Sequence, residues 1–340
     1  MSNQAAWLDG AAKNLRVAEA EYPKPDAEQI LVKNHAIAIS PVDWKVQDYG
    51  LFIQNWPAVL GTDIVGEVVQ VGSNVTKFKK GDRVLSHVIS LATQRPQDGG
   101  FQLYTTTRTN FAAPIPSSLS YKEAAVLPLA ISTAAHGLYG PTSKAFLGLD
   151  YPSVDPKPAD KTILVWGGSS SVGALAIQLA VASGVKVITV ASKHNHAFVK
   201  SLGASEAFDY NDACTVVDDV VKAISASGGD FAGIYDAVSN ESSYKFVLPL
   251  AEKLQGNINI ATTLPAPERL PSGVKAAQVF AITPDVVDPV WEKYVGQALE
   301  QGKLKAVPEP LVVGKGLEFV QKGLDTNKAG VSAKKVVIEL

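Results

Sequence analysis

The sequence of 340 residues has almost no cysteine, no strong excess of either charge and no long apolar run. Its single cysteine, Cys214, excludes an intramolecular disulfide and a cysteine-rich zinc site. The formal net charge of −2 argues against a basic surface for nucleic acid or anionic membranes. No apolar run approaches the roughly 20 residues of a membrane span, and the start, MSNQAAWLDG, lacks the features of a secretory signal. These absences predict a soluble cytoplasmic protein that binds neither nucleic acid nor membranes.

The composition that is present is that of an ordinary globular protein, 46% hydrophobic and 19% charged, and its length suits two domains. Up to about residue 115, runs such as 29–40 alternate apolar and polar residues between frequent turns, which predicts a small β-barrel or sandwich. Residues 140–161 contain four prolines and predict an exposed loop or linker. From residue 162 strands and helices alternate, which predicts βαβ units and a parallel sheet.

The stretch TILVWGGSSSVGALAIQLA, residues 162–180, predicts a strand, a tight turn and a helix. It carries the spacing of the G-x-G-x-x-G fingerprint, with serine at the middle position. So small a turn lets backbone amides approach a pyrophosphate, and the helix N-terminus adds its dipole. The serine hydroxyl is a further donor for a phosphate oxygen. The stretch therefore predicts a dinucleotide site made by Gly168, Ser169, Ser170, Ser171, Val172 and Gly173.

The segment after the next strand, ASKHNH at 191–196, has no carboxylate to bind the ribose hydroxyls of NAD. Ser192 and Lys193 stand where the adenosine ribose is expected, with His194 and Asn195 behind them. A hydroxyl and a cation suit a 2′-phosphate, so the sequence predicts NADPH rather than NADH. Tyr210 is a candidate to pack on the adenine or to bond the same phosphate.

Several stretches together resemble the medium-chain dehydrogenase/reductase family over nearly the whole chain. They are SPVDWK (40–45), GTDIVGEVVQVGSNVTKFKKGDRV (61–84), GGFQLYT (99–105), AAVLPLAISTA (124–134), GGSSSVGALAIQLA (167–180), LGASEAFDY (202–210) and GVSAKKVVIEL (330–340). The resemblance implies an α/β protein with a GroES-like β-barrel-type catalytic domain, residues 1–125 and 285–340, and a doubly wound Rossmann domain, residues 126–284. The Pro-rich stretch 140–161 is an insert in the latter.

The zinc-binding members of that family carry cysteine near the position of Ser40 and Gly-His-Glu where this chain has Gly61, Thr62 and Asp63. Neither serine nor threonine replaces a thiolate or imidazole ligand, so no metal site is expected. The remaining zinc-free members are enoyl reductases and quinone oxidoreductases. The serine-rich turn, AISTA and SKHN are similar to the fungal trans-acting enoyl reductases of lovastatin and toxin biosynthesis.

The same resemblance implies further contacts to cofactor and substrate. The cofactor would be contacted by Val42, Asp43, Lys45, Thr133, Thr263, Leu264, Ser332 and Ala333, and Phe280 would form part of the substrate wall. Lys45 is the candidate catalytic residue, as donor to an enolate oxygen, or a group that binds the cofactor ribose or an anionic carrier. For Asp43 a structural role is favoured, because a carboxylate would repel a developing enolate.

The predicted activity is NADPH-dependent reduction of an activated C=C bond, with hydride delivered to the β-carbon of an α,β-unsaturated carbonyl or thioester. An acyl thioester carried by a polyketide synthase or an acyl carrier is one possible form of substrate. Two alternatives stay open: a quinone or enone oxidoreductase on free small molecules, and a non-catalytic nucleotide-binding relative. Monomer and homodimer both fit, with QVFAIT (278–283) as a candidate edge strand for pairing.

Overall fold

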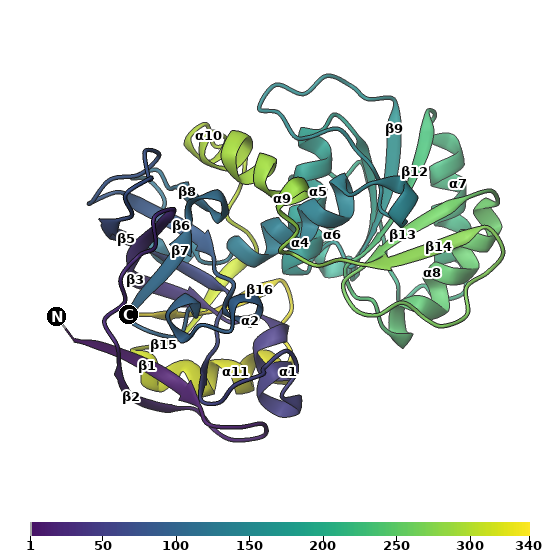
Figure 1. The fold of residues 1–340 in the computed structure, drawn as a ribbon. Helices are drawn as coiled ribbons and strands as arrows, with labels where there is room; N and C mark the ends of the chain where they lie inside the picture. The colour runs from purple at the N-terminus through teal and green to yellow at the C-terminus, as the bar shows by residue number, and fades with distance from the viewer. Residues whose placement is uncertain (1) are drawn as a thin grey trace. The chain divides into compact units, whose positions relative to one another are not determined.

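The computed structural model describes residues 2–340, and the chain divides into two compact units (Figure 1). One unit comprises the chain up to Leu129 together with Trp291–Gly302 and Ala306–Leu340; the other comprises Ala130–Val290 and Lys303–Lys305. Each unit has a hydrophobic core of its own. Across the described residues, no helix is both long enough and apolar enough to cross a bilayer.

The first unit is built mainly from β-strands. They are β1 (Asn3–Leu8), β2 (Arg16–Ala20), β3 (Gln29–Ala38), β4 (Ala58–Val59), β5 (Asp63–Val71), β6 (Arg83–His87), β7 (Tyr104–Arg108), β8 (Ala112–Pro114), β15 (Glu309–Lys315) and β16 (Lys334–Glu339). A seven-stranded sheet has the order β15-β16-β3-β5-β6-β8, with β7 paired to β3, and a smaller sheet has the order β2-β1-β4. Strand β3 is central, so most of its side chains are buried although the sequence alternates.

Short helices complete this unit. They are α1 (Pro41–Tyr49), α2 (Ser90–Thr93), η1 (Pro96–Asp98), η2 (Thr109–Phe111), α3 (Tyr121–Ala124), the π-helical turn η5 (Trp291–Val295), α10 (Gly296–Glu300), η6 (Leu317–Phe319) and α11 (Val320–Ala329). Helix α1 has proline at its first position and ends at Gly50, whose φ of 66° is left-handed. Both features are typical helix boundaries.

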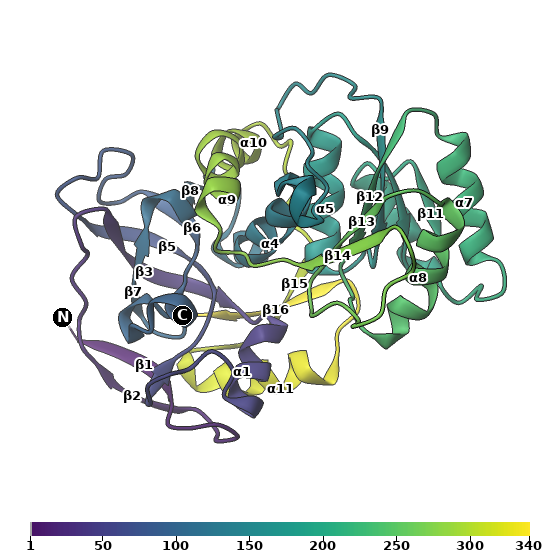
Figure 2. The same cartoon turned by 45° about the vertical axis from the view of Figure 1, so that its right-hand side comes forward.

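The second unit is a parallel sheet of six strands in the order β11-β10-β9-β12-β13-β14. Its elements are β9 (Lys161–Trp166), β10 (Lys186–Val190), β11 (Glu206–Phe208), β12 (Asp230–Asp236), β13 (Ile258–Thr262), β14 (Val274–Gln278), α4 (Pro128–Tyr139), η3 (Thr142–Lys144), α5 (Ser171–Ala182), η4 (Lys193–Asn195), α6 (His196–Ser201), α7 (Val216–Ala226), α8 (Glu241–Leu254) and α9 (Pro284–Val290). Helices α7 and α8 lie on one face of the sheet and α5 on the other (Figure 2). The order is that of a Rossmann domain and reverses between β9 and β12, which confirms the predicted fold class.

Two local expectations were wrong. The segment 278–283 is not an edge strand: β14 ends at Gln278, and the Phe280 amide then bonds the ring of His136 at 2.8 Å. The Pro-rich stretch is not uniformly exposed, since Phe146 and Leu147 are buried.

Candidate functional site

The predicted dinucleotide residues of the second unit follow the carboxyl ends of its parallel strands. The serine-rich turn follows β9, residues 191–195 follow β10, Tyr210 follows β11, and Thr263 and Leu264 follow β13. Parallel strands end at one edge of a sheet, so these segments gather there. The strand order of this sheet reverses between β9 and β12. Open α/β sheets bind ligands at the carboxyl ends of the strands beside such a reversal, which is where these segments lie.

The turn after β9 is tightly packed around its glycines. A Cβ on Gly168 would lie 2.1 Å from Thr189 Oγ1, and one on Gly173 would lie 2.2 Å from the Gly167 carbonyl oxygen. Ser170 is the N-cap of α5, and its hydroxyl oxygen accepts from the Gly173 amide at 3.0 Å. The Ser171 and Val172 amides begin this helix, where amides have no intrahelical acceptor. The turn therefore presents donors at a helix N-terminus.

The residues predicted to bind the 2′-phosphate lie beside this turn. The Asn195 side chain donates to Ser169 Oγ at 3.2 Å, and the Tyr210 hydroxyl donates to Ser192 Oγ at 3.2 Å. Lys193 and His194 are exposed, whereas Ser192 and Asn195 are buried. The bond from its hydroxyl keeps the Tyr210 ring next to Ser192, the residue at which the adenosine ribose is expected.

One carboxylate at this place, Asp209, was not among the residues predicted from the sequence. The Asp209 carboxylate accepts hydrogen bonds from the backbone amides of Asn211 and Lys193. These bonds, chiefly the one from Asn211, lower the pKa of Asp209. Asp209 therefore holds the backbone of the Lys193 segment. Its position in FDY, just beyond a short strand, was the available sequence signal.

A second missed group is the buried Asp236 at the end of β12. Its carboxylate accepts from the amides of Val238 and Ser239, both at 2.9 Å, and from the Ser243 hydroxyl at 2.6 Å. Burial raises the pKa of Asp236, and these bonds oppose the rise. Ser239 Oγ in turn accepts from the Thr263 amide at 2.8 Å. Asp236 therefore anchors the loop after β12, and Ser239 of that loop holds the backbone of the predicted cofactor residue Thr263.

The other predicted residues of this unit lie on different elements. Thr133 is on α4, and its carbonyl accepts from the Tyr235 hydroxyl at 2.8 Å. Phe280 is 53% exposed, and its backbone is fixed by His136. An exposed aromatic ring on a fixed backbone is available for ligand contact.

In the first unit, Val42, Asp43 and Lys45 lie on α1, and Ser332 and Ala333 directly precede β16. Lys45 is half-buried, its Nζ lies 5.6 Å from the centroid of the Trp44 ring, and burial lowers its pKa. Asp43 accepts from the Ser40 amide at 2.8 Å as part of a capping box. This bond supports the structural role favoured for Asp43 from the sequence.

The same unit contains a buried ionic cluster that the sequence analysis did not predict. Lys335 Nζ lies 2.5 Å from Ser40 Oγ and 3.1 Å from Asp63 Oδ2. Ser40 Oγ donates to the same oxygen of Asp63 at 3.0 Å, and the Leu129 amide donates to Oδ1 at 2.6 Å. The side chain of Lys335 is 4% exposed and that of Asp63 is fully buried. The cluster is thus an ion pair sealed from water.

Two other titratable groups face this pair. Burial raises the pKa of Asp43 to about 7; the Ser40 amide and Lys335 oppose this rise, and Asp63 adds to it. Burial lowers the pKa of His87 to about 4, with Asp63 acting in the opposite direction, so the ring is neutral at neutral pH. Lys335 is therefore the cation that balances this cluster.

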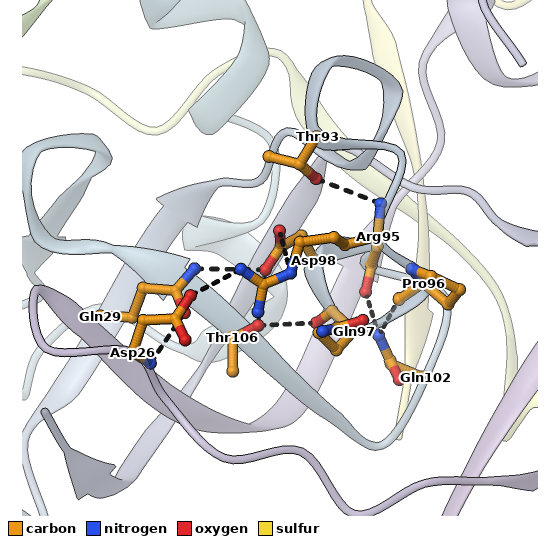
Figure 3. Close-up of polar contacts among 10 residues, drawn as sticks. Asp26, Gln29, Thr93, Arg95, Pro96, Gln97, Asp98, Gln102 and Thr106 are labelled. Atoms are coloured by element: carbon orange, nitrogen blue, oxygen red, sulfur yellow. Dashed lines mark hydrogen bonds and ion pairs between the residues drawn. The ribbon is translucent and has the colours of Figure 1, made fainter. Parts of the chain in front are cut away.

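A second polar network of this unit lies around Arg95 and is drawn in Figure 3. Arg95 pairs with Asp26 at 2.5 Å, and the buried Asp98 accepts from Thr106 at 2.6 Å and from Gln29 at 3.3 Å. These contacts connect the start of β3 and the middle of β7 to η1. The network therefore fixes a loop and is not a candidate site.

Comparison with known proteins agrees with this geometry. Residues 26–117 match the model of the alcohol dehydrogenase GroES-like domain, and residues 171–280 match that of the zinc-binding dehydrogenases. The chain is 45% identical to the dehydrogenase orsE of Emericella nidulans, covering 100% of this chain and 99% of the relative. It is 42% identical to the trans-enoyl reductase himH of Aspergillus japonicus, covering 99% and 97%.

A more distant relative is the lovastatin nonaketide synthase enoyl reductase component lovC of Aspergillus terreus, 32% identical over 94% of this chain and 92% of the relative. Among solved structures, an alcohol dehydrogenase superfamily protein from Novosphingobium aromaticivorans superposes with a TM-score of 0.77 at 22% identity, covering 99% of both chains. The structural match supports the fold, and the sequence matches extend over both units.

A nicotinamide cofactor is implied by these matches, and the second unit fits one. The donors at the start of α5, the Ser192 hydroxyl and the Lys193 ammonium are the groups that a dinucleotide phosphate requires.

Zinc is implied by the name of one matched model, and the residues present do not fit it. That model matches residues 171–280, whereas the family resemblance places zinc ligands near Ser40, Thr62 and Asp63. There the Lys335 ammonium bonds the side-chain oxygens of Ser40 and Asp63. Within residues 2–340 no cluster of three or more His, Cys, Asp or Glu side chains suits a metal ion.

Proposed function

Because this chain belongs to the medium-chain dehydrogenase/reductase family, we propose that it is an enoyl reductase that uses NADPH and no zinc. Its substrate would be an α,β-unsaturated carbonyl or thioester. The observation that carries the proposal is the Lys335–Asp63–Ser40 cluster, in a chain 42% identical to a trans-enoyl reductase. Ser40 and Asp63 stand where the family resemblance places zinc ligands. Zinc-polarised alcohol chemistry has no ligand set here, whereas C=C reduction needs only hydride and a proton.

The preference for NADPH is supported by the groups beyond β10. When bound, the reduced nicotinamide supplies the hydride. Lys193 would pair with the 2′-phosphate, and Ser192 and Tyr210 would hydrogen-bond it. Asp209, which bonds the Lys193 amide, keeps this backbone in place. The preference therefore depends chiefly on the Lys193 charge.

Lys45 is the proposed donor to the enolate oxygen. Its pKa is lowered by burial, and a half-buried ammonium is less screened than a fully solvated one. Charge that develops on the carbonyl oxygen would be stabilised by such a fixed donor. The proposed substrate form, a thioester on a carrier or synthase, is supported by the name of the relative lovC.

The test is a fluorescence titration of the protein with NADPH and NADH, with Lys193→Ala and a Lys200→Ala control on the exposed side of α6. We expect wild type and the control to bind NADPH more tightly than NADH. In Lys193→Ala the ratio of the two affinities should fall at least about tenfold, which corresponds to about 1.4 kcal/mol. Absence of binding to either nucleotide would contradict the proposal.

The loaded protein is then assayed with an enoyl thioester, an enone and a quinone, before and after treatment with EDTA. Reduction of the thioester or enone that survives the chelator is expected. Exclusive quinone reduction would favour the alternative activity, and loss of activity that added zinc restores would refute zinc independence.

A further inference from the structure

The buried ammonium of Lys335 joins parts of the chain that lie far apart in the sequence. Its partners Ser40 and Asp63 precede it by 295 and 272 residues. Ser40 is the N-cap residue of α1, and Asp63 is the first residue of β5. Lys335 itself lies on β16, next to β3 in the same sheet. One cation thus holds the start of α1 and the start of β16 together.

These two starts carry all the cofactor residues predicted in the first unit. Val42 and Lys45 follow Ser40 on α1, and Ser332 and Ala333 lie just before Lys335. The positive φ of Ala333, 47°, marks the turn by which the chain enters β16. A shift of Lys335 would therefore move both segments.

The rest of α1 is held by other bonds. Gln47 donates to Gln321 at 2.7 Å, and Asp48 pairs with Lys328 at 2.7 Å. Both partners belong to α11, which runs into the loop before β16. Removal of the Lys335 charge should therefore free the first turn of α1 while the helix stays attached at its second half.

We propose that Lys335 is a positioning residue, whose buried ammonium fixes Ser40 and Asp63 and thereby holds α1, with Lys45, and the 332–333 loop in one working arrangement. Only the expected effect on catalysis rests on the proposed function; the structural role of Lys335 does not. It also gives the chain a fixed internal cation at a place where zinc-binding relatives are expected to hold a metal ion.

The proposed role of Lys335 depends on its charge and not on its volume. Asp63 receives hydrogen bonds from Ser40 and Leu129, but Lys335 is the cation that pairs with it. A neutral side chain of similar length would leave a buried carboxylate without its counter-ion, which is strongly unfavourable. Replacement of both charges removes that penalty, so the two effects can be separated.

The experiment compares Lys335→Met with Lys334→Met, a neighbouring lysine that pairs with the exposed Glu309. Amide hydrogen exchange is followed in residues 41–50 and in α5 of the second unit, together with kcat and NADPH affinity. We expect exchange in 41–50 to rise on the order of tenfold in Lys335→Met, with little change in α5. kcat should fall on the order of tenfold or more, and Lys334→Met should match wild type in both.

The double variant Asp63→Asn/Lys335→Met guards against simple loss of folding. We expect it to regain the thermal stability of wild type, because no charge is left unpaired, but to keep fast exchange in 41–50 and a low kcat. Recovery of slow exchange and of kcat in the double variant would overturn the proposal, as would unchanged exchange in Lys335→Met. The exchange results stand even if wild type reduces none of the assayed substrates, a result that would refute only the proposed function.

Discussion

The two units of this protein carry their candidate functional groups in opposite ways. In the second unit the groups lie on turns at the ends of parallel strands, with Lys193 and Tyr210 exposed. In the first unit Ser40, Asp63 and Lys335 are buried and bonded to each other. The comparison separates groups that would contact a ligand directly from groups that act by holding a neighbour. Substitutions in the two regions should therefore fail differently.

The largest effect is expected at Lys45, which lies between these extremes because it is half-buried on α1. Lys45→Met should lower kcat by about 10²–10³-fold, the usual cost of losing one donor to a developing oxyanion. NADPH affinity should change little. Steady-state kinetics and the fluorescence titration measure the two quantities separately.

A Lys33→Met variant is the control for this substitution, because Lys33 is exposed on β3. If Lys45→Met keeps wild-type kcat but binds NADPH weakly, then Lys45 is a cofactor ligand and not the donor. That result would place it with the groups of the second unit.

A pH effect is expected from the buried cluster. Burial raises the pKa of Asp43 to about 7 from 3.8 in the unfolded chain. A carboxyl group with a raised folded pKa stabilises the fold fully below the unfolded pKa, and this stability is lost as pH rises through the folded value. Wild type should therefore lose stability relative to Asp43→Asn between about pH 4 and 7, by roughly 3–4 kcal/mol.

Denaturant unfolding at several pH values measures this difference. Asparagine keeps an oxygen that can accept the Ser40 amide, so the capping bond is retained while the titration is removed. A difference between the two proteins that does not vary with pH would show that Asp43 is charged throughout, and that Lys335 balances two carboxylates rather than one.

The sequence predicted the candidate groups of the second unit better than those of the first. The turn at 167–173 and the segment 191–195 were predictable, because their spacing from a strand end is local information. The Asp63–Lys335 pair was not, because it depends on the pairing of β16 with β3, in which Val337 lies opposite Ala38, and no pattern within either segment specifies that register. The strand expected at 278–283 failed for a related reason: a ring nitrogen of His136, on a distant helix, takes the Phe280 amide.

The smallest effect is expected at Gly168, where the packing of the turn leaves no room for a side chain. A Cβ there would lie 2.1 Å from Thr189 Oγ1, so Gly168→Ala must displace the turn or that side chain. Thr189 Oγ1 also donates to the Val165 carbonyl at 2.8 Å, which resists displacement. NADPH affinity should fall about tenfold, or about 1.4 kcal/mol, with little change in kcat at saturation.

The double variant Gly168→Ala/Thr189→Ala tests this cause, because it removes the clashing hydroxyl, and Thr189→Ala alone measures the loss of the bond to Val165. Affinity in the double variant should return to that of Thr189→Ala. If it does not, the added methyl group obstructs the ligand itself rather than the packing of the turn. The turn would then affect binding only through its own contact with the nucleotide. This would sharpen the contrast with the buried cluster of the first unit, where groups act by holding their neighbours.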